Sequence, residues 1–202
     1  MEALREVTAI AAPLLRANVD TDQIIPTRFL ARATEEGLGE GLFAEWAGDP
    51  QFALNQPPWN EAGILLAGAN FGCGSSREAA PRALRQRGFR AVIAPSFGDI
   101  FYNNCFRNGL APVRLAQDEV EALAREMEAA RGDRAACRIH VDFANCRLTS
   151  LASGRSHAFS VPPRLHRMLL EGLDEIAVTL TQADRMQAFR ATDRTRRPWA
   201  YI

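Results

Sequence analysis

The chain alternates between short, uninterrupted apolar runs and longer segments with helical periodicity. The apolar runs predict four buried strands, at residues 7–15, 64–69, 91–95 and 111–115. Runs of this kind, without polar alternation, are typical of parallel strands that are covered on both faces. Helical segments separate the last three runs, so the pattern predicts a central βαβαβ unit.

Helical patterns fill these connections and recur near the C-terminus. Residues 118–131 place Val120, Leu123, Ala124 and Met127 on one face, which predicts an amphipathic helix. The other predicted helices are a short one opened by Pro26 and the segments 79–87, 97–108, 162–171 and 181–191. Gly109 and Gly172 follow two of these segments at positions where helices commonly end.

Residues 137–161 change to alternation of apolar and polar side chains, which predicts a hairpin or three-stranded meander. A further strand is predicted at 176–180. Residues 34–60 hold several Gly and Pro and show weak periodicity; a long irregular connection of this kind is often functional. The expected fold is one α/β domain over residues 1–202, with an antiparallel appendage and a C-terminal tail from about 192.

Composition narrows the classes of partner. The chain has 202 residues and a formal net charge of zero, so no electrostatic argument favours nucleic acid or an anionic membrane. All 24 basic residues are arginines, which excludes chemistry that needs a lysine. No apolar run reaches the length of a membrane span, and the first residues carry charges where a signal peptide needs an apolar core. We therefore expect a cytoplasmic protein.

The four cysteines are dispersed, at Cys73, Cys105, Cys137 and Cys146, with no C-x-x-C spacing. In a reducing cytosol they are expected to be free thiols. Their spacing also argues against an iron–sulfur cluster or a zinc site built by this chain alone.

Residues 70–78, N-F-G-C-G-S-S-R-E, combine two glycines with two hydroxyls and a guanidinium just before a predicted helix. Glycines allow close approach of the backbone to a ligand, and helix N-termini attract anions. The segment therefore predicts an anion site, and a carboxylate is the expected anion. Ser75 and Glu78 also match the spacing of a capping box, so Ser75 is alternatively the N-cap of the helix.

Three segments together resemble the small-subunit family of 3-isopropylmalate dehydratase: V-D-T-D-Q-I-I-P at 19–26, G-A-N-F-G-C-G-S-S-R-E at 68–78, and V-I-A-P-S-F-G-D-I-F-Y-N-N at 92–104. The resemblance implies an aconitase-type swivelling β/β/α domain. It also implies a partner, a large subunit that carries a [4Fe-4S] cluster, with the active site between the two subunits. Neither subunit is then expected to work alone.

The resemblance also implies roles at the glycine-rich segment. Ser75 aligns with a serine that acts as the base, and Ser76 and Arg77 with groups that bind a substrate carboxylate. Gly74 lets the backbone approach that substrate. A positive charge at a helix start opposes the helix dipole, so Arg77 needs a compensating anion, and the substrate carboxylate is one.

In the first segment, Asp22 aligns with an aspartate that orients a histidine of the cluster-bearing partner. The alternative is that Asp20 and Asp22 cap the next helix or form an Asx turn. Arg28 follows as a candidate substrate-binding residue, in a loop, residues 27–30, that is thought to read the substrate side chain.

The chain departs from the common family pattern at two neighbouring positions. Ala79 and Arg82 replace a histidine and a tryptophan. The change suggests another diacid of the 2-methylmalate/citraconate, dimethylmalate or homoaconitate type, or a non-catalytic anion-binding module. Leucine-pathway activity remains the favoured reading. We interpret the basic C-terminal tail as exposed to solvent, and docking to the large subunit is the alternative.

Overall fold

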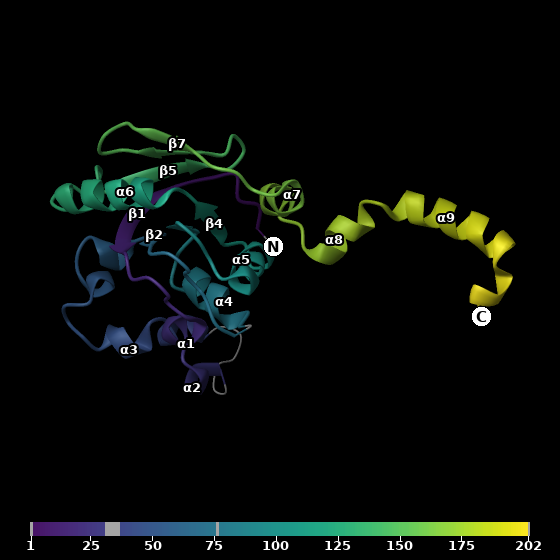
Figure 1. Cartoon of the computed structure of the whole chain (residues 1–202), viewed down its shortest axis with the longest axis horizontal. Coiled ribbons are helices and arrows are strands. Elements are labelled where there is room, and N and C mark those ends of the chain that lie inside the picture. Colours follow the sequence, from purple (N-terminus) through teal and green to yellow (C-terminus); the bar gives the residue numbers. More distant parts are fainter. Residues whose placement is uncertain (1, 31–36, 76, 202) are drawn as a thin grey trace.

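The computed structural model describes residues 2–30, 37–75 and 77–201. Over these residues, seven strands form one sheet in the order β4-β3-β2-β1-β5-β6-β7 (Figure 1). Their bounds are Glu6–Leu14 for β1, Ile64–Ala67 for β2, Ala91–Ala94 for β3, Ala111–Arg114 for β4, Arg138–Asp142 for β5, Arg147–Ser150 for β6 and Ser156–Ala158 for β7. The first four strands pair in parallel and the last three are antiparallel.

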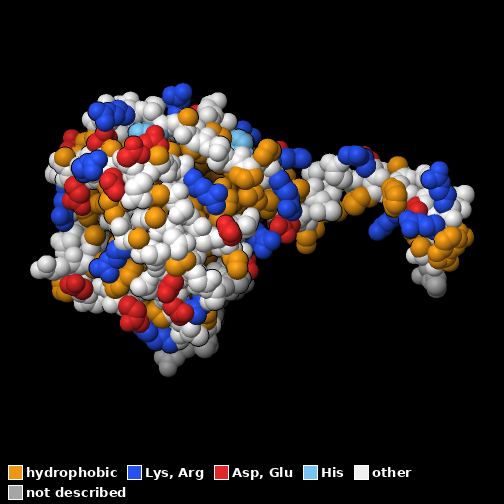
Figure 2. Space-filling view, viewed as in Figure 1, with side chains coloured by type: hydrophobic (Ala, Val, Ile, Leu, Met, Phe, Trp, Pro, Cys, Tyr) orange, Lys and Arg blue, Asp and Glu red, His pale blue; other side chains and the backbone are white. Residues whose placement is uncertain are grey.

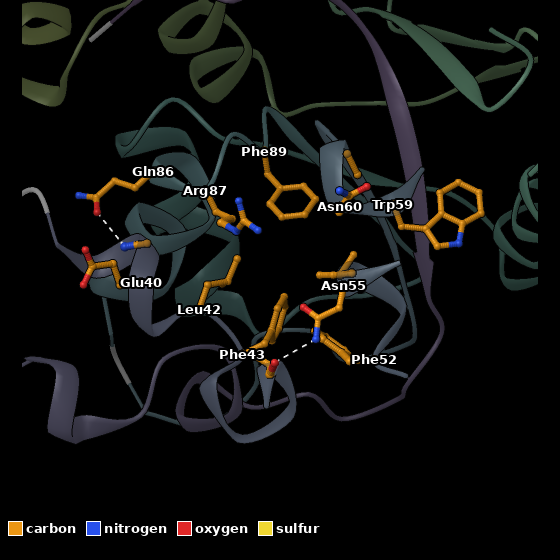
Figure 3. Close-up of a pocket in the computed structure, with 14 residues that line it drawn as sticks. Glu40, Leu42, Phe43, Phe52, Asn55, Trp59, Asn60, Gln86, Arg87 and Phe89 are labelled. Carbon is orange, nitrogen blue, oxygen red and sulfur yellow. Dashed lines mark hydrogen bonds between the residues drawn. The ribbon is translucent and has the colours of Figure 1, made fainter. Parts of the chain in front are cut away.

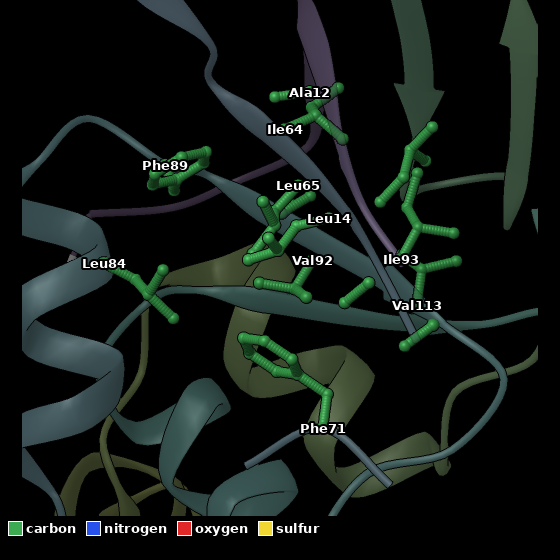
Figure 4. Packing of buried hydrophobic residues seen from close by; sticks show 14 of the residues in the cluster. Ala12, Leu14, Ile64, Leu65, Phe71, Leu84, Phe89, Val92, Ile93 and Val113 are labelled. Atoms are coloured by element: carbon green, nitrogen blue, oxygen red, sulfur yellow. The ribbon is translucent and has the colours of Figure 1, made fainter. Parts of the chain in front are cut away.

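The parallel half of the sheet confirms the four strands predicted from apolar runs. Every residue of β2 and β3 is buried, as expected for strands covered on both faces. The crossover helices are α4 (Ala79–Gln86) and α5 (Asp99–Arg107), and α6 (Gln117–Ala129) contacts β1, β2 and β3. In Figure 4, Leu84 of α4 lies in the core beside Leu65 and Val92 of the sheet.

The antiparallel half confirms the meander predicted from alternation. β5 shows the expected periodic burial, with Ile139 and Val141 buried between half-exposed neighbours. Helix α7 (Pro163–Glu171) follows and ends at Gly172, which has a left-handed backbone.

The connection from α1 to β2 consists of short helical turns in its described part. These are α1 (Thr21–Ile24), α2 (Thr27–Leu30) and α3 (Ala44–Ala47), with 3₁₀ turns at Leu38–Gly41 (η1), Ala53–Asn55 (η2) and Trp59–Glu61 (η3). Pro26 directly precedes α2, as expected. An aromatic cluster fixes the connection, because Phe43 stacks on Trp46 and meets Phe52 edge-on.

The strand predicted at 176–180 is wrong: these residues form helix α8 (Glu175–Leu180). The side chain of Asp174 caps this helix by accepting a hydrogen bond of 2.7 Å from the backbone N–H of Ala177. Ile176 is 71% exposed, so the apolar run is not buried in a sheet. The last helix, α9 (Ala183–Arg196), also extends past its predicted end into the predicted tail.

Residues 175–201, which we call the C-terminal arm, project away from the body of the molecule (Figure 1). Glu175 joins the arm to the body through ion pairs of 3.0 Å with Arg107 and 3.6 Å with Arg164. At its far end Asp193 accepts hydrogen bonds of 2.8 Å from both Arg197 and Tyr201, which folds the chain end back onto α9. None of the described helices is long and apolar enough to cross a membrane.

Candidate active site

Two motif segments meet beyond the carboxyl ends of β1 and β2. These strands are parallel neighbours, so the segments that follow them lie side by side. Gly72 donates a backbone hydrogen bond of 2.7 Å to the carbonyl of Val19, and Thr21 donates one of 3.0 Å to the carbonyl of Cys73. The structure therefore brings D-T-D and the glycine-rich turn together, as the predicted site requires.

The two glycines of the turn are required for different reasons. Gly72 has φ of +72°, and a Cβ there would lie 2.2 Å from the ring of Phe101. Gly74 has φ of +94°, but a Cβ there would meet only ordinary contacts, 3.5 Å or more from Asp20 and Thr21. Gly72 is thus fixed by both conformation and packing, and Gly74 by conformation alone.

The predicted capping box between Ser75 and Glu78 is wrong. Helix α4 begins at Ala79 with Glu78 as its N-cap and no side-chain cap. The later start places Pro81 in the first turn, where a missing N–H is tolerated. Ser75 is therefore not the N-cap; it is exposed, and no described residue forms a hydrogen bond to its hydroxyl. Ser76 lies outside the described residues.

Asp22 and Arg77 form a bidentate ion pair. Arg77 Nη1 contacts Asp22 Oδ1, and Arg77 Nη2 donates to Asp22 Oδ2 at 2.6 Å. The Arg77 side chain is only 15% exposed, and its Nη1 also reaches the carbonyl of Ile25 at 3.3 Å. The anion that Arg77 was expected to need is thus supplied, in the chain alone, by Asp22.

The carboxyl of Asp22 is held ionised by this contact. The hydrogen bond from Arg77 lowers the pKa of Asp22, and the hydroxyl of Thr27, which donates to Oδ1 at 3.2 Å, acts in the same direction. Asp20, in contrast, is the N-cap of α1 and forms a capping box with Gln23. The two aspartates of D-T-D therefore differ: Asp20 caps the helix and Asp22 does not.

Asp22 leaves one edge of the guanidinium open. An arginine carries five N–H donors in a fixed fork. Asp22 and Ile25 take three of them, while Nε–H and the second N–H of Nη2 have no partner among the described residues. That edge has the geometry to bind a carboxylate through two parallel hydrogen bonds.

Arg28 points elsewhere in this structure. Its Nη1 forms an ion pair of 2.6 Å with Glu45, and its guanidinium lies 5.1 Å from the ring centre of Phe29. Arg28 and Asp22 nevertheless share the lining of one cavity of about 410 Å³. Ser75 and Arg77 do not line this cavity, so the candidate residues form two adjoining groups.

Known proteins of one family are similar to this chain over most or all of its length. The model of the aconitase C-terminal domain family matches residues 1–118. The 3-isopropylmalate dehydratase small subunit of Cupriavidus necator is 50% identical over 210 residues, covering 100% of this chain and 99% of that protein. The corresponding protein of Paramagnetospirillum magneticum is 47% identical, covering 98% and 100%. The chain belongs to the 3-isopropylmalate dehydratase small-subunit family.

A solved structure extends the likeness to the fold. A 3-isopropylmalate dehydratase from Methanocaldococcus jannaschii is 28% identical with a TM-score of 0.66, covering 92% of this chain and 99% of that one. The expected fold class is confirmed: the chain is an aconitase-type swivelling α/β domain, with a parallel βαβαβ unit and an antiparallel appendage.

Thr21 contacts the candidate site but was not among the residues predicted from the sequence. Thr21 is buried, and its hydroxyl donates a hydrogen bond of 3.1 Å to the backbone carbonyl of Ser75. The bond ties the backbone of Ser75 to α1 across 54 residues of sequence. The only sequence signal was a hydroxyl residue between the two aspartates of D-T-D.

The thiols of the chain do not form a ligand set. Among the described residues, no three His, Cys, Asp or Glu side chains are grouped so that they could hold a metal ion. Cys105 is fully buried, and burial raises the pKa of its thiol well above the ordinary value. A thiol in this state is a poor metal ligand because metals bind the thiolate.

Proposed function

We propose that this chain is the small subunit of a hydro-lyase that interconverts 2-isopropylmalate and 3-isopropylmalate in leucine biosynthesis. The family relationship over the full chain supports the reaction. The observation that carries the assignment to a site is the contact between the two motif segments, through Thr21 with Ser75 and Asp22 with Arg77. The whole chain would act as one unit in the cytoplasm.

The reaction requires a base and a carboxylate clamp. A proton leaves a carbon beside a carboxylate, and hydroxide leaves the neighbouring carbon. The partner's [4Fe-4S] cluster would supply the Lewis acid for the hydroxyl. Ser75 is the proposed base, because its exposed hydroxyl is not engaged in capping and its backbone is held by Thr21. A serine hydroxyl must lose its proton to act as a base, so the complete site has to stabilise the alkoxide form.

Arg77 is the proposed clamp, and Ser76 and Gly74 are the further proposed substrate-binding residues. Its open Nε edge can take a substrate carboxylate while Asp22 keeps the other edge. Asp22 is 57% exposed, so it can hold Arg77 in place and still orient a histidine from the large subunit. Arg28 would contact substrate after leaving Glu45, and residues 27–30 would read the substrate side chain.

We further propose that the C-terminal arm docks on the large subunit. Its large apolar side chains are exposed: Ile176 by 71%, Leu180 by 60%, Phe189 by 61% and Trp199 by 69%. Figure 2 shows apolar and basic side chains together on the arm. A 14-residue helix such as α9 is marginal without a packing partner, so the arm needs one. The subunit relationship of the relatives supports the large subunit as that partner.

Other diacids are the second candidate function, motivated by Ala79 and Arg82. Ala79 packs against the hydrophobic core, which supports a packing role at that position and an unchanged substrate. A non-catalytic anion-binding module is the third reading. The paired Asp22 and Arg77 beside an uncommitted Ser75 favour an enzyme over it.

Reconstitution tests the proposal. The chain is co-expressed with a cluster-bearing large subunit, purified without oxygen, and assayed with 2-isopropylmalate, citraconate, dimethylmalate and homoaconitate. We expect stable association and fastest turnover of 2-isopropylmalate. Faster turnover of another diacid would reassign the substrate. A well-formed complex with its cluster intact and no turnover of any diacid would overturn the enzymatic reading.

A further inference from the structure

A second cavity, of about 470 Å³, lies in the irregular connection that the proposed active site does not use. Its bed is apolar and largely aromatic, formed by buried Phe43, Phe52 and Phe89 with Leu42 and Leu54 (Figure 3). Volumes of 300–1,000 Å³ with a mainly apolar lining are typical of small-molecule sites. This cavity therefore has the size of a ligand site, and its lining combines apolar side chains with several polar ones.

Five polar side chains line the cavity, and only two of them are charged: Glu40, Asn55, Asn60, Gln86 and Arg87. Arg87 lines it from the end of α4, and among the described residues its guanidinium has no hydrogen bond or ion pair. Asn55 also lines it; its Nδ2 donates to the carbonyls of Ala47 and Asp49 at 2.9 and 2.8 Å. The side-chain carbonyl oxygen of Asn55 can therefore accept a hydrogen bond from a ligand. Glu40 adds one carboxylate to the lining.

The site is separate from the proposed active site. Helix α4 spans eight residues, and Arg77 precedes it while Arg87 follows it. At 1.5 Å per residue, the helix alone separates the two guanidinium-bearing positions by about 12 Å. Neither Ser75, Asp22 nor Arg77 lines the cavity. The cavity is therefore distinct from the residues of the proposed active site.

We propose that this cavity binds a small monocarboxylate with an apolar body. The carboxylate pairs with Arg87, and the body lies on Phe43 and Phe89. Arginine is suited to this role because its planar fork matches a carboxylate. Glu40 repels a second negative charge, which distinguishes this ligand from the dicarboxylates expected at Arg77.

Titration of the full chain with matched probes tests the proposal. 3-Phenylpropanoate and 4-methylpentanoate serve as ligands, 3-phenylpropanamide as the neutral analogue and succinate as the dianion. Binding is followed by calorimetry and by NMR shifts. We expect saturable binding of the two monocarboxylates at concentrations up to about 10 mM, and at least tenfold weaker binding of the amide and of succinate.

Substitutions of lining residues test whether the probes bind in this cavity. Arg87→Gln should weaken the binding of 3-phenylpropanoate at least tenfold, and Ala47→Phe, at another lining position, should occupy part of the cavity and abolish binding. Arg125→Gln removes an exposed arginine of α6 and should leave binding unchanged. Absence of monocarboxylate binding, equal binding by Arg87→Gln, or equal binding of the amide would overturn the proposal. Loss of binding in the complex with the large subunit would do so too, since the cavity would then be subunit interface.

Discussion

The carboxylate of Asp22 and the guanidinium of Arg77 lie edge to edge across the two motif segments, 55 residues apart in sequence. Two charged candidates that sequence reasoning assigned to different partners thus neutralise each other in the free chain. The pair positions the Arg77 fork before any substrate arrives. Such pre-organisation reduces the cost of binding because the side chain loses little further freedom.

The pair should make stability depend on pH in a defined window. The pKa of Asp22 is lowered in the folded chain by the hydrogen bond from Arg77, so its stabilisation is complete above the unfolded pKa of about 3.9. It is lost as pH falls through the lower, folded pKa. We expect Asp22→Asn to lower the free energy of unfolding by up to about 1 kcal/mol at pH 6, since the carboxylate is largely exposed.

Denaturant unfolding at pH 3 to 7 measures this difference. The difference in free energy of unfolding between the original chain and Asp22→Asn should be constant above about pH 5 and shrink below about pH 4. Glu128→Gln is the control, because it removes an exposed carboxylate of α6 whose side chain has no hydrogen bond to a described residue. A gap that does not change with pH would mean that Asp22 acts through packing.

Ser75→Ala should strongly reduce turnover in the reconstituted complex with little change in KM. The hydroxyl is the proposed base and forms no cap, so its removal leaves the fold intact. We expect kcat to fall at least about 100-fold, the low end for loss of general base catalysis. Ser160→Ala, another exposed serine, is the matched control. A loss below about tenfold, or about 1.4 kcal/mol, would remove Ser75 from the role of base.

Thr21→Val tests the positioning of Ser75 from the neighbouring segment. The substitution keeps the shape but deletes the hydrogen bond of 3.1 Å to the Ser75 carbonyl. We expect a loss of about 1 kcal/mol in stability and a fall in kcat with KM unchanged. Thr21→Ser retains the hydroxyl and should restore kcat. A fall in kcat that Thr21→Ser does not rescue would show that only the shape of the side chain matters.

The sequence predicted the framework of the fold well because burial dictates it. Apolar runs correctly predicted β2 and β3, and helical periodicity correctly predicted the buried face of α6. It failed at 176–180, where an apolar run with β-branched residues favours a strand. The capping aspartate before that run favours helix α8, and no strand in the described part of the chain is available to pair with it.

At the candidate site, the sequence indicated the residue types but not their contacts. Motif segments at 19–26 and 68–78 were singled out, yet nothing local indicates that Asp22 would reach Arg77 or that Thr21 would reach Ser75. Those contacts depend on the parallel pairing of β1 with β2, a long-range property. The capping box at Ser75 was wrong for a local reason: α4 begins at Ala79, which places Pro81 in its first turn.

The two glycines of the turn should differ in their tolerance of a methyl group. Gly72→Ala places a Cβ 2.2 Å from the Phe101 ring at positive φ, so we expect a loss of more than about 3 kcal/mol. Gly74→Ala meets only the conformational cost of positive φ, about 1–2 kcal/mol. Denaturant unfolding ranks the two, and equal losses would contradict the packing argument at Gly72.

The arm should be dispensable for folding and necessary for association. A chain that ends at residue 173 lacks α8 and α9 but keeps the sheet, so its thermal unfolding should change little. We expect Ile176→Glu with Phe189→Glu in the full chain to weaken binding to the large subunit at least tenfold, because buried apolar anchors dominate interfaces.

Thr192→Glu adds charge at an exposed polar position of the same arm and is the control. Calorimetry with the purified large subunit measures the affinity, and light scattering of the small subunit alone tests self-association. Unchanged affinity of the double variant, or an arm-dependent dimer of the small subunit in place of the complex, would contradict docking of the arm on the large subunit.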